Sequence, residues 1–133
     1  MALLLALAAG AGGCSMSQRS GSWLGAEPKP AAILVEVQDR AAFEEGIALA
    51  ADLKYAEAQA KFRQVLAWYR ATNDRARTAE TLFWLGYCCE KQGRSADARD
   101  AYVQLVREHP SLPAARQASA RLRRLPPEKK KAP

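Results

Sequence analysis

Three cysteines and one histidine are the residues of this 133-residue chain best suited to redox, metal or nucleophilic chemistry. Cys88 and Cys89 are adjacent, so on a helix their side chains point about 100° apart and cannot form a disulfide without distorting the backbone. No second pair of ligands stands at metal-binding spacing, so we predict no metal site. We expect the two thiols to be small buried packing residues, and His109, just before Pro110, to cap the end of a helix. The alternative is an exposed Cys88 that links two chains in an oxidising compartment.

The short motifs that mark catalytic sites do not occur in the sequence. There is no phosphate-binding loop, dinucleotide fingerprint, nucleophile elbow or paired-carboxylate arrangement. We therefore predict that the protein is not an enzyme and has no catalytic residues and no cofactor.

The third cysteine, Cys14, ends an apolar segment, residues 2–13, that is too short to span a bilayer as a helix. Small residues at positions 11–13 allow an extended backbone to enter a peptidase, and the Cys14 thiol can first be alkylated by a lipid. The segment resembles a bacterial lipoprotein signal peptide. The resemblance implies a signal peptide over residues 1–13, acylation of Cys14 with palmitate-type chains, and, with Ser15 next, the periplasmic face of the outer membrane. The alternative is an ordinary apolar helix in which the cysteine is incidental.

Residues 14–36 are predicted to be the lipidated cysteine and a tether. Ser, Gly and Pro are frequent over residues 15–30, and neither a helical nor an alternating period is visible. A flexible coil of that length would span about 20–24 Å. Residues 31–36 are apolar, and they either extend the first helix or pack as a strap.

An internal repeat with an offset of forty residues organises the rest of the chain. Each copy has a glycine, an alanine twelve residues later and an aromatic residue four residues after the alanine. We expect the glycine to let two helices approach closely, the alanine to lie where the helices of one hairpin cross, and the aromatic ring to fill the gap below. The matched pairs are Gly46 and Gly86, Ala58 and Ala98, and Phe62 and Tyr102.

This skeleton resembles the tetratricopeptide repeat. Residues 79–112 form the more complete copy, with Gly93 as a helix stop, Ser95 as the next N-cap and Pro110 as the end of its second helix. Residues 39–72 form the weaker copy, which lacks a closing proline, so its second helix is expected to run on. The predicted fold is all-α, an α-solenoid of two hairpins and a C-terminal capping helix over residues 37–125, followed by a disordered basic tail over 126–133. The predicted helices cover residues 37–52, 55–72, 76–92, 95–108 and 112–124.

The resemblance also implies a concave groove, lined by the first helix of each hairpin, that binds a peptide or a partner helix. Phe83 and Tyr87 are four residues apart and share a helical face, which suits them as anchors. The alternative is that the extended second helix or residues 31–36 bury these aromatics and leave no groove, and Trp84 competes with Phe83 for the core. The positions carried over are Arg40, Phe43, Ile47 and Ala50 in the weaker copy, and Glu80, Phe83, Tyr87, Glu90 and Lys91 in the stronger one.

The net charge of +6 is confined to the C-terminal end of the chain. From residue 107 onward there are eight basic and two acidic residues, which gives +6, whereas residues 1–106 hold twelve of each. Such a segment either contacts anionic lipid headgroups or nucleic acid, or is a solvated face. If Cys14 is acylated, the compartment excludes nucleic acid, so we predict no nucleic-acid partner.

Taken together, the sequence predicts a membrane-anchored scaffold that binds other proteins in the bacterial cell envelope. Because about three repeats are usually needed for stability, self-association or a partner protein is expected to complete the structure. The alternative is a soluble cytoplasmic adaptor whose N-terminus is a misread start.

Overall fold

Five α-helices make up the part of the chain that the computed structural model describes, residues 30–127, with side chains described from residue 37 onward. Four of them start and end within one or two residues of the predicted positions. The first begins seven residues earlier than predicted, so residues 30–36, assigned above to the tether, are helical, and the alternative of an extended first helix is correct. The predicted signal peptide, Cys14 with the rest of the tether, and residues 128–133 lie outside the described residues. The helices are α1 (Pro30–Ala51), α2 (Tyr55–Ala71), α3 (Arg75–Lys91), α4 (Ser95–Glu108) and α5 (Pro113–Leu122).

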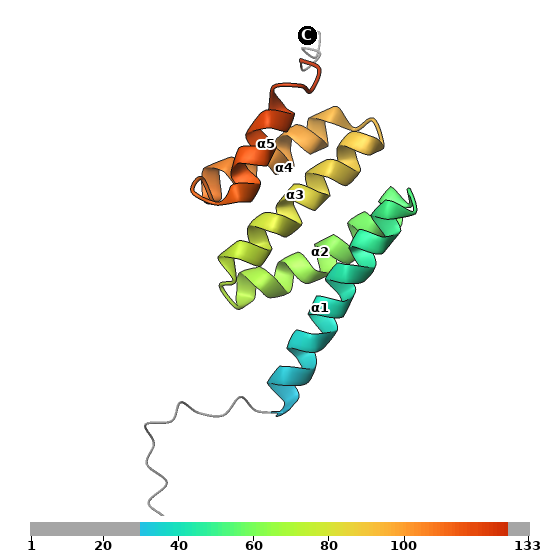
Figure 1. Ribbon diagram of the computed structural model, residues 1–133, viewed down its shortest axis with the longest axis vertical. Helices are drawn as coiled ribbons and strands as arrows, with labels where there is room; N and C mark the ends of the chain where they lie inside the picture. The colour runs from blue at the N-terminus through green and yellow to red at the C-terminus, as the bar shows by residue number, and fades with distance from the viewer. Residues whose placement is uncertain (1–29, 128–133) are drawn as a thin grey trace, which may run out of the picture.

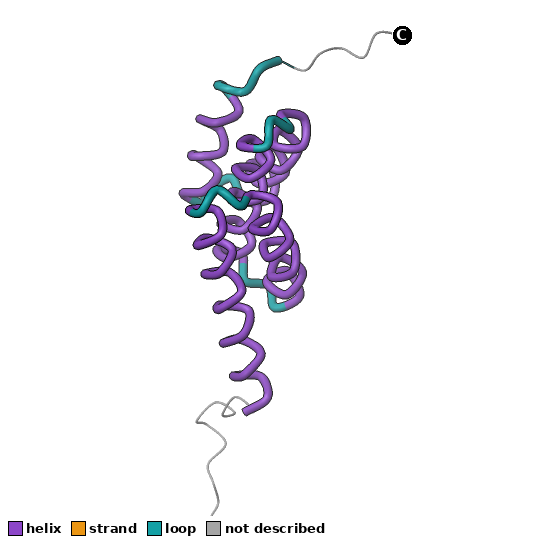
Figure 2. The backbone as a smooth tube through the Cα atoms, turned by 90° about the vertical axis from the view of Figure 1, so that its right-hand side faces the viewer, coloured by secondary structure: helices purple, strands orange, loops and turns teal. Residues whose placement is uncertain are grey.

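Consecutive helices pack side by side and stack into a short solenoid (Figure 1). The α3 helix is central, since it contacts α2, α4 and α5. The first turn of α1 and the end of α5 lie at opposite ends of the long axis (Figure 2). Within residues 30–127 there is no strand, which confirms the all-α solenoid. No helix in this part of the chain has the length and apolarity needed to cross a membrane.

A very close approach of two helices holds each hairpin together. In the first hairpin, a Cβ atom built on Gly46 would lie 2.8 Å from Cε1 of Phe62, and in the second, one built on Gly86 would lie 2.5 Å from Cε1 of Tyr102. Both rings are fully buried. The alanines of the repeat, Ala58 and Ala98, are also fully buried, as small residues at a helix crossing should be. The glycines thus approach the rings closely, and the alanines and rings are buried, in keeping with the spacing of the repeat.

The two turns within the hairpins and the turn between them share one backbone design, repeated every twenty residues. The residue after the C-cap is left-handed in each: Leu53 (φ 63°), Asn73 (φ 57°) and Gly93 (φ 74°). In each turn the N–H of this residue donates to the carbonyl three residues earlier, and the next N–H donates to the carbonyl five residues earlier, at 2.9–3.1 Å. This pattern is the Schellman motif, which satisfies the free carbonyls of a helix end. Gly93 thus forms the turn that ends α3, as the sequence predicts.

The helix starts differ in how they are capped. The N-cap of α4 is Arg94, without a side-chain hydrogen bond, so the prediction that Ser95 is the N-cap is wrong by one residue. The tight turn at Gly93 brings the chain into the helix one residue early. By contrast, the Asp74 side chain accepts a hydrogen bond from the N–H of Arg77 at 2.9 Å and caps α3. At the other end of α4, His109 is the C-cap, as predicted, one residue before Pro110.

Replacing Gly86 with alanine tests the close approach within the second hairpin. A methyl group at 2.5 Å from the Tyr102 ring must displace the ring or the helix, and overpacking of this kind costs about 1–3 kcal/mol. We expect Gly86→Ala to lower the free energy of unfolding in urea. Without that contact, the same change would raise stability by up to about 1 kcal/mol through helix propensity, so a stabilised variant would contradict the packing described here.

Replacing Leu53 with glycine tests the repeated turn. Leu53 is 71% exposed, so it loses little burial, whereas its left-handed backbone costs a non-glycine residue roughly 1–2 kcal/mol. We expect Leu53→Gly to raise the free energy of unfolding by about 0.5–1 kcal/mol in urea denaturation. Leu53→Ala is the control, because alanine removes the same side chain but keeps the backbone penalty. Equal gains in both variants would argue against the turn geometry.

Candidate functional site

The two adjacent thiols are packing residues in two different core clusters. Cys88 is fully buried in the cluster around Phe62, and Cys89 is buried in the one around Tyr102. Both are free, and the Gln59 amide donates to Sγ of Cys89 at 3.1 Å. Burial, with Cys89 as a smaller cause, raises the pKa of Cys88 to about 11, and burial also raises the pKa of Cys89. Neutral, enclosed thiols are poor nucleophiles, so the predicted packing role is confirmed.

Among the side chains of residues 37–127, no cluster of three His, Cys, Asp or Glu is close enough to hold a metal ion. His109 is buried at the end of α4, and its Nε2 lies 4.0 Å from Oε2 of Glu108.

The groove positions on α1 are only partly at the surface. Arg40 is exposed and Ile47 is half-buried, but Phe43 is 1% exposed and Ala50 is also buried. The Phe43 ring lies 5.6 Å from the Phe62 ring and is covered by the Arg77 guanidinium, also at 5.6 Å. Phe43 is therefore a core residue that no partner can reach, because Tyr69 near the end of α2 packs on it at 6.3 Å between ring centroids.

The aromatic residues of α3 form a half-buried row between the two hairpins. Trp84 stacks on the Phe62 ring at 5.9 Å, and Phe83 lies 5.8 Å from the Tyr102 ring, so each contacts one core cluster. Neither is fully buried. Phe83 and Trp84 therefore do not compete for one place in the core, because each packs against a different cluster. Both remain partly exposed.

Two cations flank the third aromatic residue of this row, Tyr87. Lys91 Nζ lies 5.4 Å and Arg121 Cζ 5.1 Å from the ring centroid. Both are within the range of a cation–π interaction. Tyr87 is therefore half-buried beneath side chains of α3 and α5.

The Glu90 carboxylate ties three helices together. One oxygen accepts a hydrogen bond from the Tyr102 hydroxyl at 3.0 Å, and the other pairs with Arg121 at 3.1 Å. Burial and the Glu90 hydrogen bond raise the pKa of Tyr102 and keep its hydroxyl a donor. Glu90, predicted to face a ligand, therefore has both oxygens engaged by α4 and α5.

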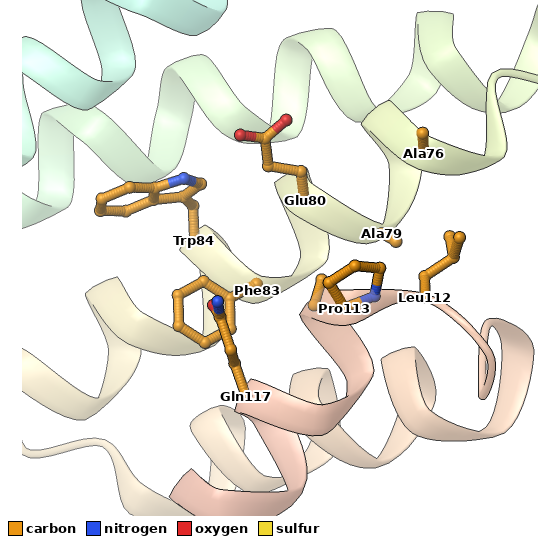
Figure 3. A pocket seen from close by; sticks show the side chains of 9 residues that line it. Ala76, Ala79, Glu80, Phe83, Trp84, Leu112, Pro113 and Gln117 are labelled. Carbon is orange, nitrogen blue, oxygen red and sulfur yellow. The ribbon is translucent and has the colours of Figure 1, made fainter.

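An apolar pocket of about 380 Å³ lies between the N-terminal halves of α3 and α5 (Figure 3). Its volume is in the range of 300–1,000 Å³ that is usual for ligand pockets. The walls are mainly the Phe83 and Trp84 rings with aliphatic side chains, and Glu80, which pairs with Arg77 at 3.4 Å, is the charged group at the lining. We call it the α3–α5 pocket. It is lined by Ala76, Ala79, Glu80, Phe83, Trp84, Leu112, Pro113, Ala114 and Gln117.

The structure brings together Glu80 and Phe83 of the predicted groove residues and adds a wall that the sequence did not indicate. The sequence predicts a capping helix over residues 112–124, but it does not indicate that Leu112, Pro113 and Gln117 lie across an open space from Phe83. Pro113 at the first helical position was the only local signal, because it fixes where α5 starts.

Comparison with known protein families supports the assignment of the second hairpin as a repeat. Residues 80–111 match the tetratricopeptide repeat family. This match covers α3 from Glu80 onward and the whole of α4, and it coincides with the copy predicted at 79–112. The first hairpin, outside the match, repeats the same contact between glycine and aromatic ring. No curated protein sequence is significantly similar to the chain. The tetratricopeptide repeat indicates a scaffold for protein–protein interactions, a class that is generally non-catalytic.

Proposed function

We propose that the protein is a membrane-anchored scaffold of the bacterial cell envelope that holds a partner protein in the α3–α5 pocket. The observation that carries the binding role is the pocket itself, an apolar cavity with two aromatic walls at the face of a tetratricopeptide hairpin. Half-exposed aromatic rings in a preformed cavity are typical anchor points of protein interfaces. Phe83 and Trp84 would take up an apolar side chain of the partner.

The rigidity of the pocket supports this role. Phe83 and Trp84 are each packed against a buried ring, and α5 is held by the pairing of Arg121 with Glu90. A partner side chain would therefore enter a cavity whose walls are already in place, so little ordering entropy is lost on binding. The partner would also add to the small core of two hairpins. Self-association of two copies of the chain would enlarge the core in the same way, and it remains a second prediction.

The membrane anchor rests on the sequence before residue 30. The apolar run that ends in small residues at Cys14 supports acylation there, and each buried methylene of an acyl chain contributes about 0.8 kcal/mol of membrane affinity. Two or three such chains would hold the domain at the periplasmic face of the outer membrane. The competing function is a soluble cytoplasmic adaptor with the same pocket.

A photo-crosslinking amino acid in place of Gln117, an exposed residue at the pocket, tests partner binding in cells. We expect a discrete protein adduct from this position and none from Gln64, which is exposed on α2 and lines no described pocket. Adding Ala76→Glu should reduce the adduct about tenfold or more, because it puts a charge against an apolar contact.

The matched control for this change is Ala96→Glu. Ala76 and Ala96 are both exposed, both are the second residue of their helix, and both have a carboxylate four residues further on, Glu80 and Asp100. The control should leave the adduct intact. If both variants lose it equally, or if Gln64 gives the same adduct, the pocket is not the binding site.

Metabolic labelling with an alkyne fatty acid tests the anchor. We expect the wild-type protein to incorporate the label and to fractionate with membranes, and Cys14→Ser to lose both properties, because the thiol is the only acceptor proposed. An unlabelled, cytosolic wild-type protein would reject the lipoprotein and favour the cytoplasmic adaptor.

A further inference from the structure

The outer face of α5 carries charge of one sign only. The segment from residue 111 to 127 contains four arginines and no acidic residue. Within it, Ala115 and Ala118 face the core, and Arg121 turns toward Glu90. Arg116, Arg123 and Arg124 remain exposed, and no carboxylate of residues 37–127 lies within ion-pair distance of them. We call these three residues the arginine face.

The spacing of the arginine face makes it one surface. Arg116 and Arg123 are seven residues apart, two helical turns, so they point the same way about 10 Å apart along the helix axis. Arg123 is the C-cap of α5 and has helical backbone angles, and Arg124 follows it in the turn after the helix, where its N–H donates to the Arg121 carbonyl at 2.9 Å. The three arginines therefore form one surface that follows α5 and the turn after it.

We infer that the arginine face binds anionic lipid headgroups. The exposed side chains between the arginines include no aromatic or large aliphatic residue, so the face lacks the stacking platform of single-strand nucleic-acid sites and the apolar anchor of protein interfaces. Attraction of several arginines to a phosphate-rich surface needs neither. The inference rests on the proposed anchor at Cys14, which brings the domain to a membrane.

The anchor and the arginine face can engage the same membrane. The start of α1, which follows the anchor in the sequence, and α5 lie at opposite ends of the long axis of the described domain (Figure 2). The sixteen steps from Cys14 to Pro30 span at most about 53–58 Å, more than the roughly 33 Å length of α1. The domain would then lie along the membrane, with acyl chains at one end and arginines at the other.

Sedimentation with vesicles tests this inference on the full chain carrying Cys14→Ser, so that no acyl chain contributes. We expect stronger binding to phosphatidylcholine vesicles with 30% phosphatidylglycerol than to phosphatidylcholine alone. Each guanidinium near an anionic surface is worth about fivefold in partitioning, so Arg116→Gln/Arg123→Gln/Arg124→Gln should weaken binding to the anionic vesicles about a hundredfold. Residues 2–13 are present in every variant, so their contribution cancels.

The control removes the same charge elsewhere, with Arg40→Gln/Arg63→Gln/Arg75→Gln at exposed positions on α1, α2 and α3. It should change binding only a few fold, and circular dichroism should show both triple variants folded. Equal losses in the two variants, unchanged binding in the first, or a loss confined to heparin or DNA binding would overturn the inference. Since acyl labelling is read separately, labelling without vesicle binding would reject the arginine face and leave the anchor standing.

Discussion

The contact of a glycine with an aromatic ring fixes the distance between the two helices of each hairpin, and the rest of the molecule is arranged around it. At Gly86 even a methyl group would come within 2.5 Å of the Tyr102 ring, so α3 and α4 are as close as their backbones and that ring permit. Because the ring is fully buried, it cannot move aside without opening a cavity. This sets the register of α3, and with it the direction in which Phe83 and Trp84 leave the helix.

The position of α5 follows from the same ring. The Tyr102 hydroxyl donates to Glu90, the second oxygen of Glu90 pairs with Arg121, and Arg121 covers the Tyr87 ring. These contacts link α4, α3 and α5 in one chain of interactions that begins in the core. They hold the C-terminal half of α5 against α3, and the α3–α5 pocket opens beside the N-terminal halves of the two helices. The pocket is thus a consequence of how the second hairpin packs its cap.

The parts of this architecture that were predictable from sequence are those written in local patterns. Glycine, alanine and aromatic residues at fixed spacing identify both hairpins, and Gly93 marks a turn, because each of these residues has a steric reason to occupy its place. The fate of Phe43 was not predictable in this way, since its burial depends on how far α2 continues and on the Arg77 side chain above the ring. The pocket was also not predictable from the sequence. Its two walls, Phe83 and the start of α5, are about thirty residues apart, and no periodicity relates them.

Four of the eight basic residues at the C-terminal end of the chain lie on the capping helix or directly after it. A solenoid needs a terminal helix that is apolar inside and polar outside, and Ala115 and Ala118 meet the first requirement. The second could be met by acidic, basic or mixed side chains, and a mixture is the usual choice for solubility. Here the charged residues of the segment from 111 to 127 are all arginines. Among them, Arg121 pairs with a carboxylate of the described residues, Glu90, and it points toward α3. Electrostatic attachment to an anionic surface requires exposed charges of one sign that are not neutralised by neighbouring carboxylates. Solubility alone does not require this.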